Sequence, residues 1–258
     1  MVFHTREEIE CFMHSLVYLG QGSQGVCYKD RQSKVVYKFY HSYFENDFEG
    51  VYGKEEILKF KNIKSSTFVF PKDVMMLNDQ VIGDITPYKK AKNLYQVNPF
   101  NINLDRFIKL VALAVKDIEE LSKKGIQSYD VMYNILWGYR LYIIDTLEYS
   151  FRDQDWRWIW QRNLSYFNLE IMYFLVDGIF GDVINHYSKL RDMYESKGRE
   201  INIVAFIMEL KNCMSKMLGH EITYLKEAKE FQDHHVLENT LKYERDIMVR
   251  DRILRLEK

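Results

Sequence analysis

The spacing of hydrophobic and polar positions changes near residue 100. From about residue 16 to residue 95, short β-branched and aromatic runs alternate with polar turns. Farther along, apolar residues recur at helical spacing in residues 104–124, 156–177, 182–197, 202–218 and 220–256. All three prolines precede residue 100, so no proline interrupts these segments. The pattern predicts an α+β protein with a small mixed part at 1–94 and a larger, mostly helical part at 95–258.

The chain concentrates glycine at one point, because Gly20, Gly22 and Gly25 supply three of its 12 glycines. The strand-like runs at 26–28 and 35–40 flank a polar turn, which predicts a β-hairpin after the glycines. A Rossmann turn would run into a helix here, and a Walker loop would continue with Gly-Lys-Ser or Gly-Lys-Thr. The sequence therefore favours a glycine loop at the tip of a hairpin over either of these phosphate-binding devices.

Further strands and one helix are expected before residue 95. Residues 54–63 predict a helix whose inward stripe is Ile57, Phe60 and Ile63. Residues 74–94 predict two strands around the turn at 78–80, followed by a chain that leaves the sheet. Together with the glycine hairpin, these elements predict a small mixed sheet with one helix.

Polar residues of catalytic type lie in residues 125–150. The helix that begins at residue 104 should end at Gly125, because two lysines followed by glycine are typical of a helix C-terminus. Asp130 and Asn134 follow, and Asp145 ends the apolar run at 141–144. Packing does not explain an aspartate at that point, because an unpaired aspartate is rarely buried. A capping role in turns remains the alternative for Asp130 and Asn134.

Composition limits the classes of partner. The 36 basic and 37 acidic residues give a formal net charge of −1, so no global basic field indicates a nucleic-acid partner. No apolar stretch approaches the roughly 20 residues that span a bilayer, and no signal-peptide core is present at the N-terminus. Three scattered cysteines indicate neither a disulfide framework nor a zinc site. We expect a soluble cytoplasmic protein with no nucleic-acid or membrane partner.

The motifs between residues 16 and 150 resemble those of the protein-kinase-like superfamily, in an atypical, compact, bacterial-type form. Gly20, Gly22, Gly25 and Val26 match its glycine loop, and residues 35–38 match its V-A-I-K strand. The resemblance implies a bilobal fold, with a small mixed β lobe and a larger helical lobe. It also implies an enzyme that binds ATP and Mg²⁺ in the cleft of that fold.

The resemblance assigns roles residue by residue. Lys38 would pair with the ATP phosphates and be held by Glu56, with Glu55 as the competing choice. Asp130 would orient the acceptor hydroxyl, and Asn134 and Asp145 would hold the magnesium ion. The complete nucleotide-binding set would be Gly20, Gly22, Ser23, Gln24, Gly25, Val26, Val36, Lys38, Thr86 as gatekeeper, Pro87 and Lys89 in the hinge, and Leu136 beneath the adenine.

The chain departs from the family pattern around the catalytic loop. Asn134 follows Asp130 by four residues instead of five, and Ser128 and Tyr129 replace the family's His and Arg. No lysine or arginine lies in residues 131–133, so the usual cation of this loop is absent. Thr146 and Leu147 replace the Phe and Gly that usually follow the metal-binding aspartate, and no Ala-Pro-Glu motif follows. The shortened loop and the missing cation favour a pseudokinase, whereas the short polar segment from Thr146 to about Asp155 favours an acceptor other than a peptide, with a protein acceptor still open.

Three functions therefore stay open. The first is an atypical kinase that transfers the γ-phosphate of ATP to a protein or small-molecule hydroxyl, as aminoglycoside and choline kinases do for small molecules. The second is a pseudokinase that acts as a nucleotide-binding or interaction module. The third is a nucleotidyltransferase on the same fold.

Two further segments have open roles. The aromatic run at 156–161 is either a stacking platform or part of the core. Residues 220–258 form either a partner or dimer contact or a solvated helix on their own lobe.

Overall fold

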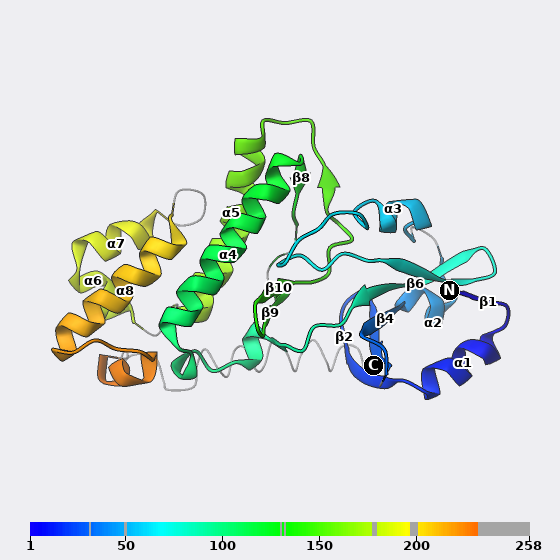
Figure 1. The fold of residues 1–258 in the computed structure, drawn as a ribbon, viewed down its shortest axis with the longest axis horizontal. Helices are drawn as coiled ribbons and strands as arrows, with labels where there is room; N and C mark the ends of the chain where they lie inside the picture. The colour runs from blue at the N-terminus through cyan, green and yellow to red at the C-terminus, as the bar shows by residue number, and fades with distance from the viewer. Residues whose placement is uncertain are drawn as a thin grey trace. The chain divides into compact units, whose positions relative to one another are not determined.

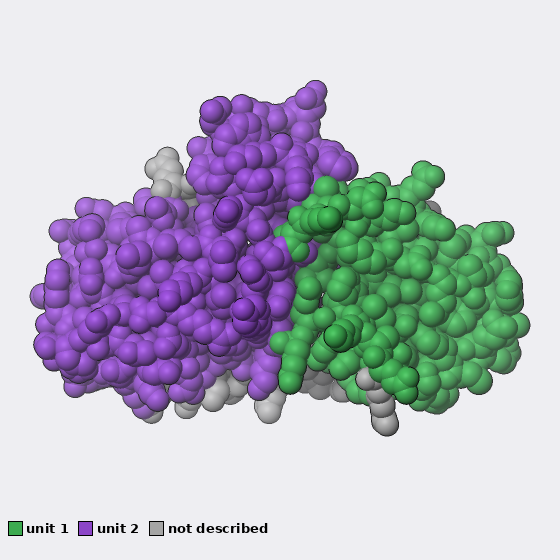
Figure 2. Space-filling view, viewed as in Figure 1, with its two compact units in different colours: residues 1–65, 69–90, 245–258 green, residues 66–68, 91–244 purple. Residues whose placement is uncertain are grey.

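The computed structural model describes residues 1–30, 32–48, 51–129, 131, 133–176, 180–196 and 201–231. These residues divide into two compact units, drawn in green and purple in Figure 2. Among the described residues, unit 1 comprises residues 1–65 and 69–90, and unit 2 comprises residues 66–68 and those from Ala91 to Phe231. Sheets and helices are both present, so the predicted α+β class is confirmed. Each unit is described below by itself.

Unit 1 is built on a six-stranded sheet (Figure 1). In spatial order its strands are β1 (Val2–Phe3), β5 (Asp73–Leu77), β6 (Gln80–Pro87), β4 (Val35–Tyr40), β3 (Gly25–Lys29) and β2 (Val17–Gln21). β1 runs parallel to β5, and all other neighbours are antiparallel. The expected hairpin after the glycines and the strand pair around residues 78–80 are both confirmed.

Alternation along β4 creates the core of unit 1. Tyr37 and Phe39 point to one face of the sheet and are buried there. Helix α1 (Arg6–His14) packs against this face, and its Phe12 ring meets Tyr37 edge-on with ring centroids 5.0 Å apart. The buried members of this core cluster are Phe3, Ile9, Tyr37, Phe39, Tyr43, Met75, Ile82 and Ile85.

Unit 1 contains two more short helices, α2 (His41–Glu45) and α3 (Lys54–Leu58). The helix expected at 54–63 is shorter than predicted. From Lys59 onward the backbone bonds span three residues, as in the bond from the Ile63 N–H to the Phe60 carbonyl at 2.9 Å, so the chain continues as tight turns. Ile57 and Phe60 of the predicted stripe are nevertheless buried, whereas Ile63 is half-buried.

Unit 2 is mostly helical. Its helices are α4 (Leu104–Lys123), α5 (Trp156–Leu175), α6 (Gly181–His186), α7 (Ser188–Glu195) and α8 (Ile203–Leu218), with 3-10 turns η1 (Leu94–Gln96), η2 (Pro99–Asn101) and η3 (Leu225–Phe231). Figure 1 shows α4 and α5 lying alongside each other. The helices expected at 104–124, 156–177 and 202–218 are confirmed to within two residues.

The segment at 182–197 is not one helix as predicted. Tyr187 has an extended backbone with φ −106° and ψ 110°, which separates α6 from α7. Of the long segment expected at 220–256, the described part contains only η3. No helix in the described ranges combines the length and the apolar character that a bilayer span needs.

Two small sheets complete unit 2. One contains β10 (Leu141–Ile143), β9 (Ile135–Trp137) and β7 (Lys92–Asn93), and the other pairs β11 (Ser150–Phe151) with β8 (Ile126–Gln127). Because β7 belongs to the first of these sheets, the boundary between the units lies at residues 90 and 91, four residues before the predicted boundary.

Residues 66–68 belong to unit 2 because α4 and β10 hold them there. Asp117 of α4 accepts hydrogen bonds from the backbone N–H of Ser66 at 3.1 Å and from that of Thr67 at 2.7 Å. The carbonyl of Thr67 accepts from the Ile143 N–H at 2.8 Å. A carboxylate that accepts several backbone donors holds the chain firmly, which explains why so short a segment joins the helical unit.

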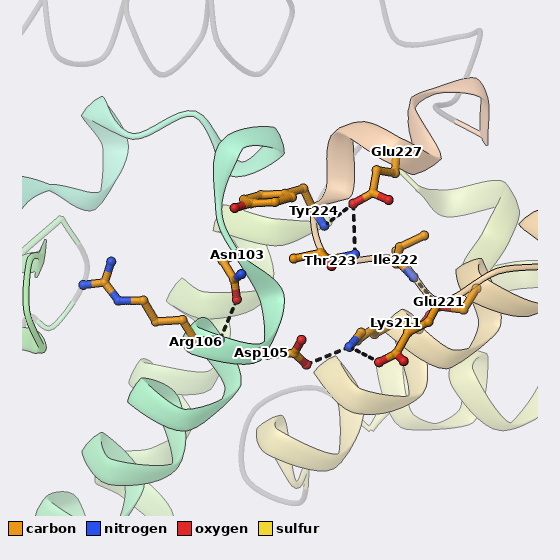
Figure 3. Close-up of polar contacts among 10 residues, drawn as sticks. Asn103, Asp105, Arg106, Lys211, Glu221, Ile222, Thr223, Tyr224 and Glu227 are labelled. Carbon is orange, nitrogen blue, oxygen red and sulfur yellow. Dashed lines mark hydrogen bonds and ion pairs between the residues drawn. The ribbon is translucent and has the colours of Figure 1, made fainter.

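A buried lysine ties the helices of unit 2 together (Figure 3). The Nζ atom of Lys211 on α8 lies 2.7 Å from Oδ1 of Asp105 on α4 and 2.7 Å from Oε1 of Glu221. Burial alone would lower the pKa of Lys211, but the hydrogen bonds to the two carboxylates outweigh it and raise the pKa. The start of α4 is capped close by, where Asn103 Oδ1 accepts the Arg106 N–H at 2.9 Å.

Candidate nucleotide and metal site

The glycine loop of unit 1 is the turn between β2 and β3. The N–H of Gly22 donates to the carbonyl of Gly25 at 2.9 Å and closes the turn, which carries Ser23 and Gln24. Gly25 must be glycine, because a Cβ atom there would lie 2.2 Å from the Phe39 carbonyl oxygen of the neighbouring strand. The three glycines thus build a compact hairpin tip, and Val26 follows on β3 as predicted.

A histidine that sequence reasoning missed holds this tip. His41 is the first residue of α2, and its backbone N–H donates to the Gln24 carbonyl at 3.0 Å. Its Nε2 atom lies 3.0 Å from the Gly22 carbonyl oxygen, a contact in which Nε2 carries the proton. Both ends of the turn are therefore fixed by one residue that directly follows β4.

Lys38 lies in the middle of β4, directly between Cys27 on β3 and Asp84 on β6. Its Nζ atom donates a 2.8 Å hydrogen bond to Oε1 of Gln24 in the glycine turn. The structure thus brings together two residues that the resemblance assigned to nucleotide binding. In this arrangement the ammonium group is aimed at the loop expected to cover the phosphates.

Glu56 lies on α3, and its carboxylate forms an ion pair with Lys59 one turn farther along the helix. About half of the Glu56 side chain, 52%, is exposed to solvent. Within the described residues, neither Glu56 nor its competitor Glu55 forms an ion pair with Lys38. The predicted pair of Lys38 with a glutamate of this helix is therefore not assembled here.

Asp84 was not predicted, although it is the charged residue directly opposite Lys38. It is only 2% exposed, and its Oδ2 atom accepts a 3.1 Å hydrogen bond from the hydroxyl of Tyr40. Opposed residues on antiparallel strands extend from the same face of the sheet, so its carboxylate shares that face with the Lys38 ammonium. The signal in the sequence was an aspartate inside the apolar run at 81–85, because buried carboxylates need a partner.

The expected hinge begins at Pro87, the last residue of β6. Thr86 pairs with Val36, and Pro87 pairs with Val35. The next backbone N–H, that of Tyr88, still donates to the Lys34 carbonyl at 2.8 Å, and Lys89 lies in the connection that leaves the sheet. Leu136, the residue expected beneath the adenine, lies in unit 2 on β9.

Unit 2 brings the two predicted metal ligands to one end of the hairpin formed by β9 and β10. Ile135 pairs with Ile143, and the Ile144 N–H donates to the Asn134 carbonyl at 3.0 Å. Asn134 and Asp145 therefore emerge next to each other where the two strands end. An amide oxygen and a carboxylate are ligands that suit magnesium.

The backbone on both sides of this point is strained. Asp145 has φ 60° and Tyr133, immediately before Asn134, has φ 65°. Non-glycine residues seldom adopt this left-handed conformation, and such strain concentrates at functional sites. These two strained residues therefore indicate a candidate site at the end of the hairpin, independently of any sequence motif.

A buried glutamate supports the strained turn, and the sequence analysis missed it. Glu170 on α5 is only 1% exposed, and its Oε1 atom accepts the Tyr133 N–H at 3.3 Å. Its Oε2 atom accepts the hydroxyl proton of Tyr95 at 2.9 Å, and the Tyr95 ring lies 4.7 Å from the Tyr133 ring. Asn93 donates through Nδ2 to the Tyr133 carbonyl at 2.6 Å. The backbone before Asn134 is thus held on both of its polar groups.

Helix α4 holds the turn end of the same hairpin. Arg106 donates through Nη2 to the Gly138 carbonyl at 2.6 Å, and its guanidinium lies 4.8 Å from the centre of the Trp137 ring. The Phe107 ring also contacts Trp137, with centroids 5.7 Å apart. The hairpin that carries the two candidate ligands is therefore anchored at both ends by long helices.

Asp130, the predicted catalytic aspartate, lies outside the described residues. Within the described part of the chain, no three His, Cys, Asp or Glu side chains come together as a metal-binding cluster. A metal at Asn134 and Asp145 would thus take its other ligands from water or phosphate oxygens, as magnesium commonly does.

No protein-family model matches the chain, and no curated protein does. Among solved structures, it is similar to the twitchin kinase region of C. elegans, a chain described as Fn31-NL-kin-CRD-Ig26, with 16% identity and a TM-score of 0.43. The match covers 59% of this chain and spans 29% of the twitchin chain.

Proposed function

We propose that the protein is an ATP- and magnesium-dependent phosphotransferase, an atypical kinase with a bilobal kinase-like fold. The glycine turn and Lys38 would bind the phosphates, and Asn134 and Asp145 would bind the metal ion. The acceptor would be a hydroxyl group of a protein or a small molecule.

The observation that carries this proposal is that Asn134 and Asp145 lie at the same end of the β9–β10 hairpin, where the two strands end side by side. Their side-chain oxygen atoms are the ligand type that a hard divalent cation prefers. The left-handed backbone at Tyr133 and Asp145 is a strained conformation of the kind that concentrates at functional sites. Independent support comes from unit 1, where the Lys38 ammonium reaches the glycine turn through Gln24.

In the proposed reaction the acceptor oxygen forms a bond to the γ-phosphorus while the bond from that phosphorus to the β,γ-bridging oxygen breaks, and ADP leaves. Asp130 would orient the acceptor hydroxyl and take its proton. Magnesium, when bound, would neutralise charge on the phosphates. Lys38 and the backbone N–H groups of the glycine turn would hold the phosphates in line, so the protein's contribution is mainly positioning and electrostatics.

Calorimetry of ADP with and without magnesium tests the proposal. Asp145→Asn should weaken the magnesium-dependent binding by roughly tenfold or more, because it removes a full charge from the metal site, and Asn134→Ala should have a smaller effect. Asp79→Asn is the matched control, because Asp79 is exposed in the β5–β6 turn. Wild-type protein that binds neither ADP nor ATP with magnesium present contradicts the proposal.

One observation favours a second candidate, a nucleotide-binding module without phosphotransfer. Glu56 pairs with Lys59, so the lysine–glutamate pair typical of an active kinase is not formed. Incubation with magnesium and γ-labelled ATP, alone and with cell extract, separates the two functions. Nucleotide binding without labelled product in either condition supports the module, whereas transfer that Asp145→Ala abolishes supports the kinase.

A further inference from the structure

Unit 2 contains a pocket whose lining does not include the candidate metal ligands Asn134 and Asp145. This open pocket of about 340 Å³ lies between the start of α5 and the small sheet formed by β8 and β11. Its lining is rich in arginine, glutamine and aromatic side chains: Gln127, Tyr129, Arg152, Gln154, Trp158, Arg162 and Tyr166. The volume falls at the lower end of the range for small-molecule sites, so a compact molecule fits this pocket better than a polymer.

The first cation of the pocket, Arg152, is exposed but held in place. Its Nε atom lies 3.2 Å from Oε1 of Gln127 and 3.1 Å from the hydroxyl of Tyr129, and its Nη2 atom also donates to that hydroxyl. The guanidinium lies 5.7 Å from the centre of the Tyr129 ring. These contacts occupy Nε and Nη2 and leave the two N–H groups of Nη1 for a ligand.

The second cation, Arg162, has an unused donor. It follows Trp158 by one helical turn, and its guanidinium lies 5.4 Å from the centre of that ring. Its Nε atom is buried and has no hydrogen-bond partner among the described residues. Its other nitrogens, Nη1 and Nη2, also form no hydrogen bond among the described residues, so their N–H groups can donate to a ligand in the pocket.

The chemistry of the lining defines the ligand. The lining contains two arginines and, among the described residues, no carboxylate, so it favours an anion. Arginine forks match phosphate and carboxylate oxygens, and the faces of Trp158, Tyr129 and Tyr166 suit a flat ring. Trp158 keeps 39% of its surface exposed, so its ring is accessible. Of the aromatic run at 156–161, Trp158 is the residue that lines the pocket.

We propose that this pocket binds the acceptor of the phosphotransfer reaction, and that the acceptor is a small anionic molecule with a planar ring and a phosphate or carboxylate group. The inference rests on the proposed function, because Tyr129 directly precedes Asp130, the residue expected to orient the acceptor hydroxyl. Arg152 and Arg162 hold the anionic group, and Trp158 stacks on the ring. They supply the positive charge that residues 131–133 lack.

Phenyl phosphate carries both a planar ring and a phosphate group. The indole N–H resonance of Trp158 reports on its binding at this pocket. The full chain, labelled with ¹⁵N in its four tryptophans, is titrated with phenyl phosphate, inorganic phosphate and phenol in the absence of nucleotide. Trp158→Phe identifies the Trp158 resonance. Phenyl phosphate should shift this resonance at lower concentration than either partial probe, because it engages the arginines and the ring together.

Variants then assign the anion contacts. Arg162→Gln and Arg152→Gln should each weaken phenyl phosphate binding by roughly tenfold, because each removes charge-assisted hydrogen bonds. Arg157→Gln is the matched control and should leave binding unchanged, because Arg157 lies outside the pocket lining and pairs with Asp155. Unchanged dispersion of the other indole resonances shows that each variant is folded.

Each outcome decides between the two proposals. No shift of the Trp158 resonance up to about 10 mM phenyl phosphate, tenfold above a millimolar Kd, overturns the pocket even if magnesium-dependent ADP binding is intact. Phenyl phosphate affinity that is unchanged in both Arg152→Gln and Arg162→Gln also overturns the proposed binding pocket. Phenyl phosphate binding in a protein that fails to bind ADP with magnesium overturns the proposed function, and with it the acceptor role.

Discussion

Lys38 on β4 and Asp84 on β6 lie directly opposite each other, so an ammonium and a buried carboxylate extend from the same face of the unit 1 sheet. Asp84 also accepts the Tyr40 hydroxyl at 3.1 Å. The charge that faces Lys38 thus comes from a neighbouring strand, whereas Glu56 on α3 forms its ion pair with Lys59.

This relationship predicts a charge-compensation effect on stability. Lys38→Met should lower the free energy of unfolding by about 1–3 kcal/mol, because the buried Asp84 carboxylate loses the cation that faces it. Adding Asp84→Asn should restore much of that loss, because the uncompensated charge disappears. Urea denaturation of the two single variants and the double variant measures this coupling.

Lys34→Met is the matched control, because Lys34 is exposed and lies directly before β4. It should change the free energy of unfolding by less than about 0.5 kcal/mol. Purely additive effects of Lys38→Met and Asp84→Asn would show that the two charges do not interact.

A second prediction concerns Glu170, whose carboxylate accepts the Tyr133 N–H directly before Asn134. Glu170→Ala should reduce magnesium affinity in the presence of ADP by roughly 10–100-fold, because the strained Tyr133 backbone that orients Asn134 loses its acceptor. Binding of ADP without magnesium should stay the same. Calorimetry at several magnesium concentrations separates the two quantities.

The conservative variant Glu170→Gln should recover part of the magnesium affinity, because its amide oxygen can still accept the Tyr133 N–H. Gln161→Ala, an exposed position on the same helix, should have no effect. Equal loss of ADP affinity with and without magnesium would point to a general destabilisation instead of positioning.

The third prediction separates chemistry from binding. Asp130→Asn should keep near-normal ATP affinity and lose transfer activity by ~10²–10⁴-fold, because a group that acts chiefly in the transition state lowers turnover without raising the apparent KM for ATP. Steady-state kinetics with labelled ATP measure both quantities. Full activity in Asp130→Asn, combined with loss in Asp145→Asn, would assign acceptor orientation to another residue, and Glu148 is the first to test.

The fourth prediction uses the buried Lys211. Its pKa is raised in the folded protein by Asp105 and Glu221, despite burial that acts in the opposite direction. Because the pKa of Lys211 is raised on folding, its charged form stabilises the folded protein. This stabilisation is fully present at pH values below the ordinary pKa of 10.5 and is lost as the pH rises through the raised pKa. Lys211→Met should therefore destabilise the protein at about pH 8 by roughly 1–3 kcal/mol and lose less stability than wild type on going to about pH 11.

Chemical denaturation at the two pH values measures this difference. Lys189→Met is the matched control, because Lys189 pairs with Glu209 in an ion pair whose lysine side chain is 71% exposed. Exposed pairs contribute little, so this variant should follow the wild-type pH dependence. A parallel pH dependence in Lys211→Met and wild type would contradict the role assigned to Lys211.

The sequence by itself determined the helices and strands that are specified by residues close together along the chain. The hairpin after Gly25, the strands around Asn78 and the helices α4, α5 and α8 follow from periodicity, turn residues and capping, which act between residues close along the chain. The meeting of Asn134 and Asp145 was accessible for the same reason, because a short hairpin joins them.

Only the tertiary structure decided which distant polar residues meet. Asp84 lies 44 positions from Tyr40, and Glu170 lies 37 from Tyr133, so no local pattern could pair them. Strand register placed Asp84 opposite Lys38, and helix packing turned Glu170 toward the strained turn. The same holds for the break at Tyr187, where apolar spacing continues although the backbone is extended. Periodicity reports which face of an element is buried, whereas the partner on that face depends on contacts between segments that only folding brings together.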